Sequence, residues 1–216
     1  MDVIMEYFEL VLNEVKKIYT NIQGSHGWEH TERVYNLCLH IGEKEAADLT
    51  VIKYAAILHD IGRKEQDESN GRLCHAEIGA AKSRKILNKY DLNKDFIEKV
   101  IHCVETHRYR GENIPGSLEA KILFDADKLD AIGAIGIGRA FVFAGENRAK
   151  VHDKDVDIEK TKSYTEDDTA YREYLVKLRY IKDKLLTTEG KRLGKVRHDF
   201  MVEFFNRLNQ EVEGLI

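Results

Sequence analysis

Histidine and aspartate recur in this chain at positions where apolar runs end, and these residue types can bind a metal ion. His59 and Asp60 directly follow the run Tyr-Ala-Ala-Ile-Leu, while His30 and Asp127 lie within two other largely helical stretches. A carboxylate buried among apolar residues is costly unless a positive charge lies beside it. The sequence therefore predicts a cation near Asp60 and Asp127.

Two kinds of cation satisfy this requirement. Two imidazoles and two carboxylates are a suitable ligand set for a borderline divalent ion. The alternative is a network of ion pairs in which Arg33, Arg63 or Lys128 neutralises the acids. The residues by themselves leave both interpretations open.

Helices must position these side chains, because apolar residues repeat with helical spacing. Three faces of this kind each include a histidine at or one turn from their end: His30 with Val34, Leu37, Cys38 and Ile41; Ile52, Ala55, Ala56 and His59; Phe96, Val100, Val104 and His107. The chain has a single proline, and no stretch alternates as a strand would. We therefore predict an all-α fold in which several helices direct imidazoles to one region.

Helix ends and C-terminal helices are also predicted. Gly42 and Gly62 follow apolar faces, where glycine commonly caps a helix C-terminus, and a further helix should begin near Leu118. Two more stripes, which predict C-terminal helices, are Leu175, Leu178, Ile181 and Leu185, and then Leu193, Val196, Phe200, Phe204 and Leu208. Residues 145–169 are densely charged and poor in large apolar residues, which indicates a mobile surface loop or a lid over substrate.

Composition narrows the function classes. A chain of 216 residues suits one domain spanning 1–216, and a net charge of −4 argues against a partner that is a nucleic-acid polymer. Three cysteines without a Cys-x-x-Cys pair suit a reducing compartment. No stretch approaches the roughly 18 apolar residues that span a bilayer, so we expect no membrane association and a cytoplasmic location.

Three motifs resemble the HD superfamily. They are HxxRV at 30–34, AAILHDIGR at 55–63 and DADKLDA at 125–131. The resemblance extends from about Gly24 to the C-terminus and leaves out the first helix and residues 145–169. It implies a compact multi-helix HD-domain bundle with extra C-terminal helices, and it implies that His30, His59, Asp60 and Asp127 bind a metal. His152-Asp153 and His198-Asp199 lack the flanking residues of the motif.

The resemblance also implies an activity. Members of this family use a divalent ion to grip phosphate oxygens and to activate water, so the chain is expected to be a metal-dependent phosphohydrolase. The implied substrates are small phosphorylated metabolites, foremost nucleotides, cleaved by a phosphatase or a pyrophosphatase. One ion is expected, with manganese preferred to magnesium, iron, nickel, cobalt or zinc. Asp60 is expected to orient or deprotonate the water.

Further residues have expected roles around this centre. His26 and Arg33 are candidates for catalysis, His26 as a proton donor or phosphate contact. The candidates for binding substrate phosphates are Arg33, Arg63, His75, His107 and Lys128. His75 and His107 are alternatively ligands of a second metal, since they resemble histidines of HD-GYP phosphodiesterases, although the GYP signature is absent. The stripe around Phe200 and Phe204 is either core or a homodimer face.

The sequence also allows two other classes of function. One is a two-iron HD-type oxygenase of small polyols or phosphonates, which would need His75 and His107 as ligands. The other is a non-catalytic nucleotide-binding module. An alarmone hydrolase is disfavoured because the Glu-Asp pair expected after HDIG is absent. Which nucleotide is used and which phosphate bond is cleaved stay open.

Overall fold

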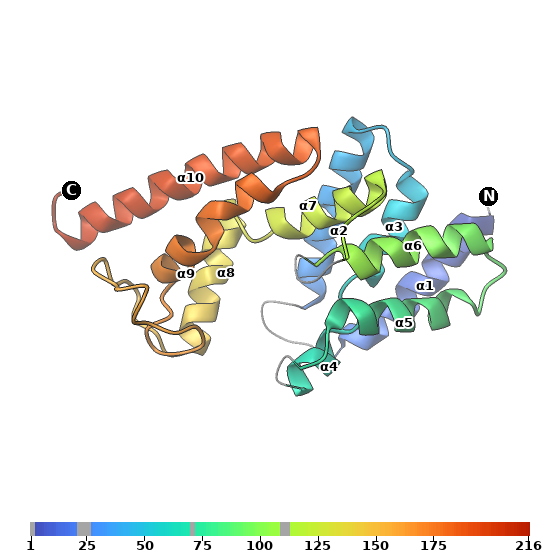
Figure 1. Cartoon of the computed structure of the whole chain (residues 1–216), viewed down its shortest axis with the longest axis horizontal. Coiled ribbons are helices and arrows are strands. Elements are labelled where there is room, and N and C mark those ends of the chain that lie inside the picture. The colour runs from blue at the N-terminus through green and yellow to red at the C-terminus, as the bar shows by residue number, and fades with distance from the viewer. Residues whose placement is uncertain (1–2, 21–26, 70–71, 109–112) are drawn as a thin grey trace. The chain divides into compact units, whose positions relative to one another are not determined.

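The computed structural model describes residues 3–20, 27–69, 72–108 and 113–216, and within these residues the chain forms helices and no strand (Figure 1). The predicted all-α class is confirmed. The helices group into two compact units, Met1–Asp127 and Lys128–Ile216. Each unit is described by itself below.

The first unit is built around one helix. Its elements are α1 (Val3–Tyr19), α2 (Trp28–Lys44), α3 (Leu49–Leu58), α4 (Arg63–Glu68), α5 (His75–Leu87), α6 (Lys94–Thr106) and α7 (Leu118–Leu129), whose last two residues belong to the second unit. Helix α3 packs against α1, α2, α5 and α6. Its side chains from Val51 to Leu58 are buried except for Lys53, which is half-buried, as expected of a helix enclosed on all sides.

Helix α3 is held at its start and in its middle. At its start, the Asp48 carboxylate accepts hydrogen bonds from the backbone N–H groups of Thr50 and Val51, which have no partner within the helix. In its middle, the fully buried Tyr54 donates from its hydroxyl to the Ile4 carbonyl at 2.6 Å. These contacts fix where the C-terminal end of α3, and hence His59, lies within the first unit.

Neither predicted glycine cap is a C-cap. Helix α2 continues past Gly42 to Lys44, and a Cβ at Gly42 would lie 2.8 Å from the side chains of Leu49 and Ile52. Gly62 instead precedes α4, where a Cβ would lie 2.4 Å from the His75 carbonyl oxygen. Both predictions were wrong because these glycines allow close helix packing, which a local pattern does not distinguish from a cap.

The second unit contains α8 (Gly133–Glu146), α9 (Ala170–Val176), a 3-10 helix η1 (Leu178–Lys184) and α10 (Thr188–Val212). The helix predicted near Leu175 is broken at Lys177, and Leu178 and Ile181 are buried at the three-residue spacing that suits a 3-10 helix. The stripe predicted on α10 is exposed at Val196 and Phe200, and its role as a homodimer face stays a prediction.

The inward face of α10 is set by close packing on η1. Its buried residues include Gly190, Gly194, Met201 and Phe205. A Cβ at Gly194 would lie 2.2 Å from Leu185 Cδ1, so any larger residue would force the Leu185 side chain to move. The glycine-bearing face therefore turns inward, and part of the more apolar stripe beside it stays exposed.

The charged segment after α8 is irregular and is attached by specific contacts. Arg172, itself buried, donates from Nη1 to Asp168 Oδ1 at 2.8 Å and from Nε to Thr161 Oγ1 at 2.7 Å. The Tyr164 ring lies against Phe143 of α8. Mobility of residues 145–169 and their action as a lid stay predictions.

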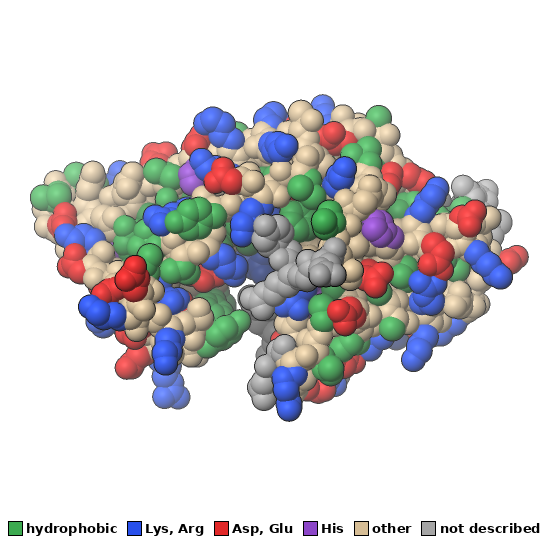
Figure 2. Space-filling view, in the orientation of Figure 1, with side chains coloured by type: hydrophobic (Ala, Val, Ile, Leu, Met, Phe, Trp, Pro, Cys, Tyr) green, Lys and Arg blue, Asp and Glu red, His purple; other side chains and the backbone are tan. Residues whose placement is uncertain are grey.

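The surface carries both signs of charge. On the face shown in Figure 2, lysine and arginine side chains are interspersed with aspartate and glutamate. Among the described residues, no helix combines the length and the apolar character needed to cross a bilayer.

Candidate metal centre

The four predicted metal ligands lie together in the first unit. His30 is in the first turn of α2, His59 ends α3, Asp60 follows it, and Asp127 lies near the end of α7. His30, His59 and Asp60 are almost completely buried, and the Asp127 side chain is 19% exposed. Three stretches that are far apart in the sequence therefore converge, and Asp127 is the ligand open to solvent.

Their donor atoms are close enough to share one ion. His30 Nε2 lies 3.3 Å from His59 Nε2, 3.4 Å from Asp127 Oδ1 and 3.7 Å from Asp60 Oδ2. Two ligands that each bind an ion at about 2.1 Å lie no more than about 4.2 Å apart. These distances, with neutral nitrogen and anionic oxygen donors, fit a divalent ion.

The end of α3 orients the His59 ring. The last carbonyls of a helix have no intrahelical partner. His59 Nδ1 donates to one of them, the Ala56 oxygen, at 2.8 Å. Because Nδ1 carries the proton, Nε2 presents its lone pair toward His30 and Asp60, which is the form that binds a metal.

A second triad, which contains Asp60, lies beside the first triad of His30, His59 and Asp127. Asp60, His75 and His107 are all buried, and their donor atoms lie within 4.8 Å of one another, as do those of His30, His59 and Asp127. The two oxygens of Asp60 divide between the groups. Oδ2 lies toward His30 and His59, whereas Oδ1 lies 3.2 Å from His75 Nε2 and 3.7 Å from His107 Nε2.

Both histidines of the second triad are oriented by acceptors behind them. His107 ends α6 as His59 ends α3, and its Nδ1 donates to the Val104 carbonyl at 2.6 Å. His75, at the start of α5, has Nδ1 2.8 Å from Gln66 Oε1. Their Nε2 atoms therefore face Asp60 and each other, 3.0 Å apart.

Arg63 contacts Asp60 and His75 of the second triad. Its Nη2 donates to both oxygens of Asp60 at 3.1 Å and lies 3.4 Å from His75 Nε2. The ion-pair alternative weighed from the sequence is thus realised at Asp60, alongside ligands suited to a metal. The contact also explains why Asp60 is tolerated at a fully buried position.

Burial and neighbouring charges set the protonation states. Burial lowers the pKa of His59 to about 4 and that of His75 to about 2, against partial compensation from Asp60. Burial acts to raise the pKa of Asp60, but Arg63 and the surrounding histidines outweigh it and hold that pKa well below its usual range. At neutral pH the site offers two neutral imidazoles and a carboxylate, all ready to bind a cation.

Acid is expected to destabilise the metal-free protein. Between about pH 6.5 and pH 4, His59 and His75 stay neutral in the folded state, whereas the unfolded chain protonates them. The unfolded state then binds more protons, so the free energy of unfolding falls as the pH falls. Each histidine contributes up to about a tenfold change in the folding equilibrium per pH unit.

Urea unfolding in EDTA at several pH values between 7.5 and 4.5 measures this effect. His75→Gln removes one titrating group, so the dependence on pH should become shallower in that variant. Equal slopes for the wild type and His75→Gln would contradict the assignment of His75.

Three other residues predicted from the sequence to serve the site are Arg33, Lys128 and His26. Arg33 is half-buried on α2, and Lys128 is half-buried at the end of α7 in the second unit. His26 lies outside the described residues. The roles of these three residues in catalysis or phosphate binding stay predictions.

Gln66 is the residue of this site that sequence reasoning missed. It lies on α4 and accepts hydrogen bonds from the Nδ1 and the backbone N–H of His75. A polar residue three positions after Arg63 gives no signal of its own, because its partner is nine residues further along the chain.

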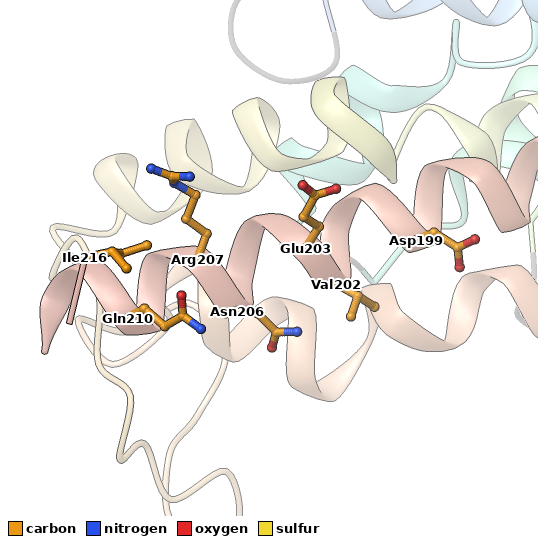
Figure 3. A pocket seen from close by; sticks show the side chains of 7 residues that line it. All are labelled: Asp199, Val202, Glu203, Asn206, Arg207, Gln210 and Ile216. Atoms are coloured by element: carbon orange, nitrogen blue, oxygen red, sulfur yellow. The ribbon is translucent and has the colours of Figure 1, made fainter.

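A pocket of about 470 Å³ lies elsewhere, on one side of α10 (Figure 3). Its lining residues are Asp199, Val202, Glu203, Asn206, Arg207, Gln210 and Ile216, and all but Val202 are exposed. None of them belongs to either triad. This pocket therefore lacks the chemistry that the metal centre provides.

Comparison with known proteins agrees with this geometry. The HD domain family matches residues 27–132, which include both triads and Arg63. YpgQ of Bacillus subtilis (strain 168) is 32% identical over 211 residues, which cover 96% of this chain and 94% of YpgQ. Ribonuclease Y of Alkaliphilus metalliredigens is 33% identical over 113 residues, only 52% of this chain and 21% of that enzyme.

Solved structures extend the likeness over nearly the whole chain. The crystal structure of Bacillus subtilis YpgQ in complex with ADP aligns with a TM-score of 0.75 at 29% identity, covering 97% of this chain and 96% of that one. An HD-superfamily hydrolase from Bacillus thuringiensis aligns with a TM-score of 0.77 at 27% identity, covering 97% and 98%. The resemblance found in the sequence is confirmed, and this chain belongs to the HD superfamily of metal-dependent phosphohydrolases.

Proposed function

We propose that this enzyme hydrolyses phosphate bonds of nucleotides, with one divalent ion, foremost Mn²⁺, held by His30, His59, Asp60 and Asp127. The observation that carries the proposal is the convergence of these donors, with His30 Nε2 3.3–3.7 Å from the other three and His59 Nε2 3.8 Å from Asp60 Oδ2. An ion bound there would act as a Lewis acid, neutralising phosphoryl oxygens and making a nearby water more acidic.

The substrate class is supported by likeness to YpgQ, whose crystal structure holds ADP. It is also supported by the net charge of −4, which suits a small anion better than a nucleic-acid polymer. We propose that the protein acts in the cytoplasm without binding a membrane, as the sequence predicts. We also propose that it can form a homodimer.

Side chains of the site have distinct proposed tasks. Because the pKa of Asp60 is held low, its carboxylate stays ionised and can bind the ion and accept a hydrogen bond from the attacking water. The solvent-open Asp127 marks the side from which substrate would approach. Arg33 and Lys128 are proposed to neutralise substrate phosphates, and His26 to donate a proton to the leaving group.

The test is a release assay with Mn²⁺-loaded protein over nucleoside mono-, di- and triphosphates, with phosphate and pyrophosphate measured separately. We expect at least one nucleotide class to be hydrolysed, and the released product identifies a phosphatase or a pyrophosphatase. His59→Ala should abolish release because it removes an inward-facing ligand. A folded, Mn²⁺-loaded wild type that releases neither product from any nucleotide would contradict the proposal.

The second triad supports one further candidate, a two-iron oxygenase of small polyols or phosphonates. That chemistry needs ions at both triads. Two irons per chain in freshly purified protein, with oxygen consumption, would favour it over hydrolysis. Arg63, whose Nη2 contacts both Asp60 and His75, argues against it.

A further inference from the structure

The proposed hydrolysis assigns no role to His75 and His107 of the second triad. Asp60 Oδ1, His75 Nε2 and His107 Nε2 are buried and lie 3.0–3.7 Å apart. These separations are as short as those of the first triad. By distance and residue type alone, the second triad is equally suited to an ion.

The three ligand atoms, Asp60 Oδ1, His75 Nε2 and His107 Nε2, point lone pairs at one another. His107 Nδ1 faces the Val104 carbonyl, which can only accept, so Nδ1 carries the proton. His75 Nδ1 faces Gln66 Oε1, and the backbone N–H of His75 also points to that oxygen, which supports its assignment as the acceptor. Both Nε2 atoms therefore face the Asp60 carboxylate as acceptors. Three buried acceptors at this spacing need a positive group among them.

Arg63 supplies that positive group. A single nitrogen, Nη2, is 3.1 Å from each Asp60 oxygen and 3.4 Å from His75 Nε2. The side chain is only 12% exposed, so its charge acts in a poorly solvated setting. Arginine keeps its proton at any working pH, so this cation is permanent.

We propose that the Arg63 guanidinium takes the place of a second metal ion, so that the centre binds one ion where its ligands would otherwise hold two. The charge beside His75 repels a divalent cation, and Nη2 engages both Asp60 oxygens, including Oδ1, which such an ion would bind. Arg63 is thus a positioning residue that sets metal stoichiometry. The inference rests on the metal centre of the proposed function.

Metal counting tests this without any assay of turnover. Metal-free protein is titrated with Mn²⁺, free Mn²⁺ is followed by electron paramagnetic resonance, and bound metal is measured by elemental analysis after desalting. We expect one ion per chain in the wild type and two in Arg63→Ala, with a spin-coupled signal from the ion pair. Arg63→Lys keeps the charge and should stay at one.

Matched variants locate the second ion. Arg63→Ala combined with His75→Ala should return to one ion, because the opened site loses a ligand. If Arg63→Ala does not fold, Arg63→Gln, which keeps a polar side chain of moderate length, replaces it with the same expected count. One ion in the folded neutral variant, or two in the wild type, would overturn the inference. Failure to hydrolyse nucleotides would overturn only the proposed substrate, since the ion count does not depend on turnover.

Discussion

Asparagine in place of Asp60 is expected to lower nucleotide hydrolysis by about 10³-fold at saturating Mn²⁺. Asp60 contacts both triads, with Oδ2 toward His30 and His59 and Oδ1 toward His75 and His107. Asparagine keeps the size of the side chain but replaces a charged acceptor with a neutral amide. Initial rates and Mn²⁺ affinity measure the effect.

The same change also removes the anion that faces Arg63. Leaving a buried partner without its counter-charge costs about 3–5 kcal/mol, so unfolding must be separated from lost chemistry. Circular dichroism and urea unfolding give the folded fraction under the assay conditions. The double variant Asp60→Asn, Arg63→Gln should regain stability without regaining hydrolysis.

Asp48→Ala is the control for destabilisation alone. It removes the cap of α3, at a cost of about 1 kcal/mol. Asp48 and His59 lie at opposite ends of a ten-residue helix, roughly 15 Å apart, so the metal ligands should be unaffected. An Asp60→Asn enzyme that is folded, binds Mn²⁺ as tightly as wild type and retains more than about a tenth of its activity would contradict the role of Asp60.

Alanine in place of Gly62 should be strongly destabilising, by about 3 kcal/mol. The added Cβ would lie 2.4 Å from the His75 carbonyl oxygen and 2.7 Å from the Gly79 nitrogen. Both are backbone atoms, so no side chain can rotate away and the start of α5 must move. The backbone angles of Gly62, φ −94° and ψ 3°, are accessible to alanine, so the cost is steric and not conformational.

His75 begins the helix that would be displaced, so the variant should also disturb the second triad. Urea unfolding measures the loss of stability. Gly138→Ala is the matched control, because a Cβ there meets no described atom within 4 Å and alanine favours the interior of α8. It should be neutral or slightly stabilising. Equal stabilities of the two variants would show that α5 does not pack on Gly62 as described.

The helical fold and the first triad were predictable because the signals are local. Burial repeats with the helical period, so His59 is recognised as the inward end of the face containing Ile52, Ala55 and Ala56. A carboxylate directly after such a face needs a cation, which identifies Asp60. The HD motif then associated both residues with His30 and Asp127.

Several features followed only from how the helices pack. Nothing near Arg63 indicates that it pairs with Asp60 and not with substrate, because that depends on the turn between α3 and α4. Likewise, Gln66 reaches His75 across a loop, and Gly62 is needed for the approach of α5. At Phe200, the apolar stripe allowed either core or a homodimer face, and the structure leaves this residue exposed while Gly194 faces Leu185.

The sequence alone thus determined the secondary structure class, which depends on spacing along a helix, and its resemblance to the HD superfamily identified the four residues proposed to bind one ion. The tertiary structure decided which cation faces the second group of ligands. That choice depends on distances of a few ångströms between side chains of different helices, which spacing along one helix does not encode.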